Sequence, residues 1–269
     1  MTRTPLAALK YVFLTLAAIC SLFPLYFMFI SATNTSADVS RSRLLPGGAF
    51  ADNLDKLVHQ QNLGAAMGYS TIYAVSSALL SLLVCSIAGY GFEIYHSRNK
   101  DRLMGLLLLT MMIPFAATMI PLFRMFANLN LVSTIPAVVL PTIATPFLIL
   151  LFRQSSRSFP HEIIEAARLD GLSELAIFFR MFLPTMRSTY AAAAVITFMA
   201  AWNNFLWPKV ILVDSRLQTM PMLVASLTSG YVTDYGVLML AVLFASLPTM
   251  ILFLILQRSF AEGITGAVK

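Results

Sequence analysis

The chain has 269 residues, of which 58% are hydrophobic and only 11% are charged. A soluble domain carries about 25% charged residues, so this composition cannot cover a water-facing surface. Soluble enzymes and disordered chains are therefore excluded, and a polytopic membrane protein is expected. The 18 basic residues outnumber the 12 acidic ones, but they lie between apolar runs rather than in a patch with interleaved aromatic residues, so no nucleic-acid partner is expected.

Six apolar runs are long enough to cross a lipid bilayer, which requires about 20 residues of helix. Unpaired backbone groups are costly in lipid, and these runs do not alternate as barrel strands do. The sequence therefore predicts an all-α integral membrane protein with six transmembrane helices in a single domain over residues 1–269. The predicted spans, none of which contains a charged residue, are 11–33, 68–92, 103–123, 132–152, 188–208 and 236–257.

The basic residues between the spans predict the orientation of the chain, because short basic loops stay in the cytoplasm. With the N-terminus inside, twelve of the 18 lysines and arginines face the cytoplasm. Both termini are then cytoplasmic. The first apolar run is longer than the apolar core of a signal peptide and lacks a clear cleavage site, so we expect it to be a retained helix.

Proline and glycine mark two features inside the spans. Pro136, Pro141 and Pro146 stand five residues apart in the fourth run, so a straight helix is not expected there. Neighbouring helices can satisfy the freed carbonyls, or the prolines can form a flexible wall around a translocation path. Gly89 and Gly91 lack the third glycine of a dinucleotide-binding fingerprint, and we interpret them as a helix-packing site.

Catalytic and metal-binding motifs are missing from the sequence. There is no phosphate-binding loop of the G-x-x-x-x-G-K-[ST] type, and Glu165 stands where an H-E-x-x-H zinc motif starting at His161 needs its second histidine. Cys20 and Cys85 each lie in an apolar run and are expected to be small core residues. Because no span carries a charge, ion-coupled transport is not favoured, and energy for uphill transport would come from another subunit.

The longest cytoplasmic loop, residues 153–187, carries signals for two short helices. Pro160 can open the first helix and Glu162 suits its first turn. Gly171 can supply a left-handed turn after Leu169, and Ser173 can cap a second helix running to about residue 182. The apolar side of this hairpin could rest on lipid headgroups or fit the groove of a soluble partner. That apolar side comprises Ile163, Ile164, Ala167, Leu172, Leu175, Phe178, Phe179 and Phe182.

The same loop resembles the EAA signature of bacterial ABC-importer permeases, E-A-A-x-x-x-G-x(9)-I-x-L-P. Every spacing matches, and Met181 replaces the usual isoleucine. The segment from Trp202 to Pro208 resembles the W-N-x-F-L-x-P segment of maltose-type sugar permeases, and the tail from Gln257 to Lys269 resembles theirs. The resemblance assigns ATPase coupling to Glu165, Ala166, Ala167, Asp170, Gly171, Leu183 and Pro184.

The resemblance implies the type I ABC-importer permease fold, with the EAA loop as its coupling helix, in the bacterial cytoplasmic (inner) membrane. The chain would pair with a second homologous permease, two copies of a cytoplasmic ATPase and an extracytoplasmic solute-binding protein. It would form half of the path for a sugar, expected to be a di- or oligosaccharide. No cofactor is expected in this chain, because ATP and Mg²⁺ would be bound by the ATPase.

The candidate solute path is the polar segment near the end of the fifth run, formed by Trp202, Asn203, Asn204 and Trp207. Buried amides need hydrogen-bonding partners, so these residues could line a sugar route. They could instead bind the facing helix or lie in the outer aromatic belt. Two rival functions remain at this point: the same machinery for glycerol-phosphate or polyol cargo, and a stand-alone channel or secondary carrier.

Overall fold

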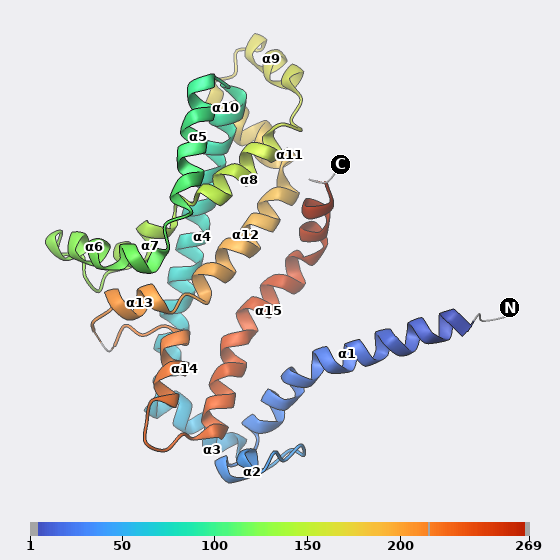
Figure 1. The fold of residues 1–269 in the computed structure, drawn as a ribbon, viewed down its shortest axis with the longest axis vertical. Coiled ribbons are helices and arrows are strands. Elements are labelled where there is room, and N and C mark those ends of the chain that lie inside the picture. Colours follow the sequence, from blue (N-terminus) through green and yellow to red (C-terminus); the bar gives the residue numbers. More distant parts are fainter. Residues whose placement is uncertain (1–4, 215, 267–269) are drawn as a thin grey trace. The chain divides into compact units, whose positions relative to one another are not determined.

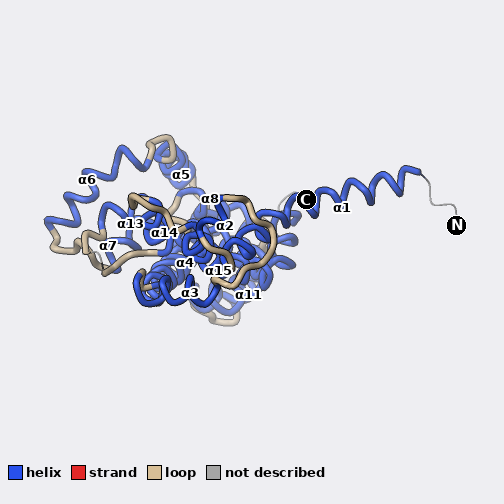
Figure 2. Tube along the Cα trace, turned by 90° about the horizontal axis from the view of Figure 1, so that it is seen from below, coloured by secondary structure: helices blue, strands red, loops and turns tan. Residues whose placement is uncertain are grey.

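The computed structural model describes residues 5–214 and 216–266, with side chains described for residues 9–214 and 216–257. Every regular element in these ranges is a helix, joined by turns and loops (Figure 2). This agrees with the predicted all-α class. The described chain divides into two compact units, one formed by the residues up to Ala66 with Met220–Leu247, the other by Met67–Thr219 with the residues from Pro248.

The first unit is built from the N-terminal helices and the start of the last helix. Its elements are α1 (Pro5–Ala32), α2 (Ser36–Ser40), α3 (Phe50–Asp55), the π-helix η1 (Lys56–Gln60), α14 (Met220–Thr228) and the beginning of α15 (Tyr235–Gly266) (Figure 1).

A polar contact network closes the first unit where α1 ends and α15 begins. The buried amide of Asn53 donates to the carbonyls of Ala32 and Asn34, each at 3.0 Å. The Asp234 carboxylate accepts from the Ser36 hydroxyl at 2.7 Å and the Lys56 ammonium at 2.9 Å. Burial acts to raise the pKa of Asp234, but these two hydrogen bonds, a third from the Val237 amide and the charge of Lys56 together hold the pKa below its usual value.

The second unit contains most of α4 and all elements up to α13. In chain order these are α4 (Leu63–Ile94), α5 (Arg98–Thr110), α6 (Phe115–Asn128), α7 (Ile135–Val139), the 3₁₀-helix η2 (Leu140–Thr142), α8 (Pro146–Ser156), α9 (His161–Leu169), α10 (Glu174–Ile177), the π-helix η3 (Phe178–Phe182), α11 (Leu183–Thr185), α12 (Arg187–Trp202) and α13 (Leu206–Ile211) (Figure 1).

Three of the predicted spans correspond to long single helices. Leu9–Ala32, Leu63–Ile94 and Tyr235–Gln257 are each long and apolar enough to cross a membrane. Two further spans are broken: Arg98–Thr110 and Phe115–Asn128 meet at 97°, and Ile135–Thr142 and Pro146–Ser156 meet at 49°. Up to five spans therefore meet this criterion among the described residues, while the six-helix count and the cytoplasmic termini stay predictions.

The breaks correct the expectation of continuous runs over 103–123 and 188–208. In the first, Pro114 caps α6 with an extended backbone after the turn at Met111, because the residue before and at a proline resists helix continuation. In the second, α12 ends at Trp202 and α13 starts at Leu206. The fourth run is bent, as its three prolines predicted.

Close packing at Gly89 joins α4 to α8. A Cβ atom at this position would lie 2.6 Å from the Phe152 Cβ and 2.7 Å from the Arg153 amide nitrogen. A Cβ at Gly91 would meet nothing within 4 Å. The predicted helix-packing site is therefore confirmed at Gly89 but not at Gly91. Cys85 is buried, as predicted, whereas Cys20 is exposed in this chain and so is not a core residue here.

Candidate functional site

The first helix of the long loop forms as its end signals predict. Helix α9 spans His161–Leu169. Pro160 was expected to be the first residue of this helix and is instead its N-cap. Gly171 has φ +79°, its amide donates to the Arg168 carbonyl, and the Leu172 amide donates to the Ala167 carbonyl, both at 3.0 Å. These two bonds are the Schellman motif. Glycine at 171 therefore fixes the direction in which the chain leaves α9.

The second helical segment is capped by Ser173, whose hydroxyl accepts from the Ala176 amide at 3.3 Å. It continues through α10 and the π-turn η3 into α11, which ends at Thr185. This end lies beyond the expected one near residue 182. Pro184 is in the first turn of α11, where a missing N–H is tolerated, so it does not end the segment.

An aromatic cluster braces the loop against α4. Tyr90 of α4 packs edge-on against Phe182, with ring centroids 4.8 Å apart, and against Phe178 at 5.4 Å. Phe159, at the start of the loop, packs on Phe182 at 5.5 Å. Each aromatic pair contributes about 0.5–1.5 kcal/mol beyond simple burial. Ile164, Ala167, Ile177 and Met186 complete this buried cluster.

Four further apolar side chains of the loop are exposed, although the Phe179 ring still packs edge-on against Phe178 at 5.0 Å. We call Ile163, Leu169, Leu175 and Phe179 the coupling patch; their exposed fractions are 39%, 90%, 66% and 47%. Exposed apolar groups gathered on one short loop indicate an interaction surface. The predicted coupling residues divide in the same way. Glu165, Ala166, Asp170, Gly171 and Pro184 are exposed, Leu183 is half-buried, and Ala167 is buried in the chain's own core.

An ion pair joins the two helices of the loop. The Arg168 Nε donates to Glu174 Oε1 at 2.7 Å, and the guanidinium lies 5.9 Å from the centre of the Tyr95 ring. The hydrogen bond from Arg168 lowers the pKa of Glu174 below its usual value. By contrast, Glu165 and Asp170 form no ion pair with another described residue, so both carboxylates are available to an external partner.

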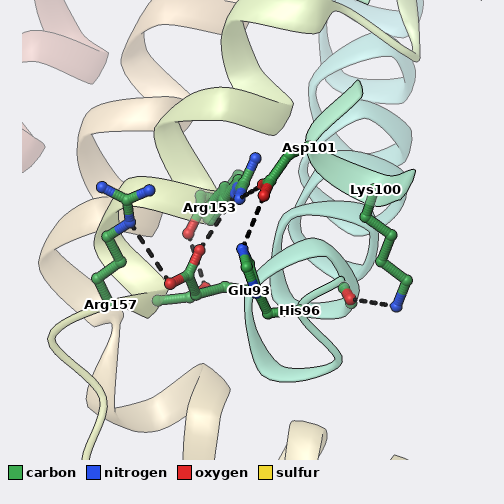
Figure 3. A network of polar contacts seen from close by, with 9 residues as sticks. Glu93, His96, Lys100, Asp101, Arg153 and Arg157 are labelled. Carbon is green, nitrogen blue, oxygen red and sulfur yellow. Dashed lines mark hydrogen bonds and ion pairs between the residues drawn. The ribbon is translucent and has the colours of Figure 1, made fainter. Parts of the chain in front are cut away.

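A group of charged residues lies where α4, α5 and α8 meet (Figure 3). The Arg153 Nε donates to Glu93 Oε2 at 3.1 Å, while its Nη2 contacts Asp101. The Arg157 Nε lies 3.4 Å from the other Glu93 oxygen, and the His96 Nε2 lies 2.9 Å from Asp101. The side chain of Arg153 is only 7% exposed. We call these five residues the charge cluster.

The charge cluster was not predicted from the sequence, where charged residues served only to predict which side of the membrane each loop faces. Glu93 directly follows the second predicted span, and Arg153 directly follows the fourth. One signal was available in the sequence: an acidic and a basic residue end two apolar runs on the same predicted cytoplasmic side. The pairing itself joins residues 60 positions apart, so spacing could not have identified it.

The segment from Trp202 to Pro208 forms the break between α12 and α13. Trp207 is fully buried, donates from its indole N–H to the Ala137 carbonyl at 2.9 Å, and packs against Phe115. Trp202 is 2% exposed and stacks on Phe198 at 5.7 Å. Both rings therefore have packing partners within the chain. The tryptophans thus belong to the protein interior in this structure.

The two asparagines of this segment differ in their surroundings. Asn203 is exposed, and its amide donates to the Met199 carbonyl of its own helix at 2.9 Å. Asn204 is half-buried and lines a cavity of about 630 Å³ within the second unit. Of the predicted path residues, only Asn204 borders this cavity.

Hydroxyl groups on three helical elements share the cavity with Asn204. Ser81 donates to the Thr142 carbonyl at 3.0 Å, and Thr142 donates to the Ser77 oxygen at 3.3 Å. The rest of the lining is mostly apolar, and no lining residue is charged. Such a wall can exchange hydrogen bonds with a neutral solute, but it offers no counter-charge to an anion. The polar lining groups are Ser77, Ser81, Thr142, Thr145, Thr197 and Asn204.

Comparison with known proteins places the chain among transporters. Residues 81–266 match the family of binding-protein-dependent transport system inner membrane components. The lactose transport system permease protein LacG of Rhizobium radiobacter is 44% identical over 260 residues, covering 97% of this chain and 95% of that protein. The arabinooligosaccharides transport system permease protein AraQ of Bacillus subtilis is 31% identical, covering 96% and 94%.

Two further similarities bear on the fold and the breadth of the family. The sn-glycerol-3-phosphate transport system permease protein UgpE of Yersinia pestis is 28% identical over 269 residues, covering 96% of each chain. A crystal structure of a bacterial ABC transporter that imports the acidic polysaccharide alginate contains a chain with TM-score 0.81 and 20% identity, covering 96% of this chain and 98% of that chain. This match supports the predicted permease fold.

The apolar helices and these relatives agree on a transport role for this chain. Among the described residues, no group of three or more His, Cys, Asp or Glu residues could hold a metal ion. The chain belongs to the family of binding-protein-dependent transport system inner membrane components, as a multi-pass permease subunit of a carbohydrate-type ABC importer.

Proposed function

We propose that this permease forms half of the pathway for a neutral di- or oligosaccharide and is driven by an ATPase that binds the coupling patch. Its partners would be a second homologous permease, two copies of the ATPase and an extracytoplasmic solute-binding protein, with the bilayer around all spans of a single permease domain. The observation that carries the proposal is the exposed coupling patch on a loop whose other face is anchored to α4.

The structure of the loop favours docking to an ATPase over lying on the lipid headgroups. A lever must transmit displacement without bending, and here the Schellman turn, the Arg168–Glu174 pair and the aromatic cluster stiffen it. Glu165 and Asp170 lie exposed on the same loop. Arg168 and Arg180 are exposed on the loop as well, and Arg168 is paired with Glu174. The cytoplasmic lipid surface is negative and would repel the two exposed carboxylates, so the apolar patch beside them fits a protein groove better.

Replacing Leu169, the most exposed residue of the coupling patch, tests this docking. We expect Leu169→Ser to weaken ATPase binding by at least tenfold, because burying a leucine in an interface contributes about 1.5–3 kcal/mol. Leu45→Ser is the matched control, since Leu45 is 67% exposed on the predicted outer side. The measurement is a titration of the purified permease pair with the ATPase. Equal affinities for both variants would contradict the proposal.

The cavity wall is the proposed part of the solute path in this chain. Asn204 would contribute an amide to the sugar hydroxyls, with Ser77, Ser81 and Thr142 beside it, while Trp202 and Trp207 would hold the wall in place. The tail after Arg258 resembles one that touches the ATPases in maltose-type permeases, and it lies outside the residues whose side chains are described. The absence of cations from the lining favours neutral cargo over a glycerol-phosphate ester.

Substituting each asparagine separately tests whether its amide contacts the solute or only packs within the protein. We expect Asn204→Ala to lower uptake about threefold to tenfold, as for the loss of a hydrogen bond of about 0.5–1.5 kcal/mol. Asn203→Ala should leave uptake unchanged, because that amide binds its own helix. Uptake of radiolabelled lactose, arabino-oligosaccharides and sn-glycerol 3-phosphate by the complete importer is the measurement. Uptake of glycerol 3-phosphate alone would identify the rival cargo.

A further inference from the structure

The charge cluster lies beside α4, a helix that both ends of the coupling loop, residues 153–187, contact. Arg153 is in the last turn of α8, eight residues before α9 begins, and it binds Glu93 of α4. The returning limb of the loop packs on Tyr90 of α4 through Phe178 and Phe182. Tyr90 and Glu93 are three residues apart, so they lie on one face of the helix.

The same helix reaches the proposed path. Ser81 lines the cavity, twelve positions before Glu93 on the uninterrupted helix α4. At 1.5 Å per residue, this separation is about 18 Å. Arg153 also contacts Asp101 in the first turn of α5. The guanidinium group of Arg153 therefore connects the start of the loop to both α4 and α5.

The composition of the charge cluster suits a contact that must rearrange. Two carboxylates, Glu93 and Asp101, are shared among Arg153, Arg157 and His96. Apolar side chains of similar volume would stabilise a fixed joint at least as well as a buried ion pair does. Shared ion pairs differ from apolar packing in that a charge can exchange partners when helices shift, which gives discrete alternative arrangements.

We propose that Arg153 is a positioning residue for coupling: it links movement of the coupling loop to the cytoplasmic ends of α4 and α5, and thereby to the cavity wall. This inference rests on the proposed ATPase docking at the coupling patch. It concerns transmission and assigns Arg153 no contact with either the solute or the ATPase.

The test measures the solvent accessibility of the cavity wall in the complete importer, in which the permease is reconstituted with its sister permease and ATPase in proteoliposomes. The reporter is Ala200→Cys, which is exposed and lines the cavity, in a background with Cys20→Ser and Cys85→Ala. A membrane-impermeant thiol reagent reads its accessibility with and without MgATP and orthovanadate, which needs no knowledge of the cargo. ATP hydrolysis and ATPase retention are measured on the same samples.

In Arg153→Met we expect ATP hydrolysis and ATPase retention to persist while the vanadate-dependent change in thiol reactivity falls at least fivefold. Arg153→Lys should restore part of the change. Arg98→Met is the matched control and should behave as the parent complex, because Arg98 is exposed in the first turn of α5 and forms no ion pair with another described residue. If Arg153→Met does not assemble, Glu93→Gln with Arg153→Met removes both charges and is expected to show the same loss.

An assembled Arg153 variant with the parent's full reactivity change would overturn the inference, since a merely structural residue alters yield and stability but not this change. A parent complex that neither retains the ATPase nor responds to vanadate would overturn the proposed function instead. The two failures are therefore distinguishable.

Discussion

Gly171→Pro is expected to abolish ATP-driven transport while the permease still inserts and pairs with its sister subunit. Gly171 has φ +79°, whereas proline fixes φ near −65°. Proline also removes the amide that donates to the Arg168 carbonyl and disfavours the helical conformation of the residue before it. The Schellman turn therefore cannot form, and the two helices of the loop lose their fixed relation.

The matched control at this position is Gly171→Asn, because asparagine tolerates the left-handed region better than other residues. A Cβ there meets nothing within 4 Å, so only conformational strain of about 1–2 kcal/mol is expected. Solute uptake and ATP hydrolysis by the reconstituted importer are the measurements. Uptake by the proline variant at the rate of the asparagine variant would show that the turn is not needed for coupling.

Gly89→Ala is expected to destabilise the permease by about 3 kcal/mol, the upper end of the usual cost of overpacking. The added methyl group would lie 2.7 Å from the Arg153 amide nitrogen and 2.9 Å from the Ile149 carbonyl oxygen. Because these are backbone atoms, no side-chain rotation can relieve the clash. Helices α4 and α8 would have to separate, and the Glu93–Arg153 contact would lengthen with them.

Gly91→Ala serves as the control in the same helix. Its methyl group would enter open space, and alanine favours a helix over glycine by about 1 kcal/mol. We expect thermal unfolding in mild detergent to occur at a lower temperature for Gly89→Ala and at an unchanged or higher one for Gly91→Ala. Equal unfolding temperatures for the two variants would refute the close packing of α4 and α8.

The two ends of α9 and the start of α10 were predictable because their signals are local. A proline before α9, a glycine after it and a serine before α10 act on backbone groups within four residues, so sequence alone identifies them. The division of the coupling loop's apolar face was not predictable. Phe178 is buried and Phe179 is exposed, and the choice between them depends on Tyr90, a residue far away in the sequence.

The broken spans and the cavity show the limits of hydrophobicity as a guide. Apolar composition predicts that a run lies in lipid, but it carries no information on where a helix bends against its neighbours. Pro114 and the Asn203–Asn204 pair were visible in the sequence, yet only the structure shows that α6 begins after Pro114 and that α12 ends just before Asn203. It also separates Asn204, on the cavity, from Asn203, which binds its own helix.

The sequence by itself determined the membrane environment, the helical class, the helix ends on either side of Gly171 and the family, because composition, periodicity and helix-end signals are local properties. Tertiary structure decided which side chains are exposed on the loop, which glycine packs two helices together and which charges meet at the base of the loop. Glu93 and Arg153 are 60 positions apart, and their pairing depends on how α4 and α8 pack, which no local rule specifies.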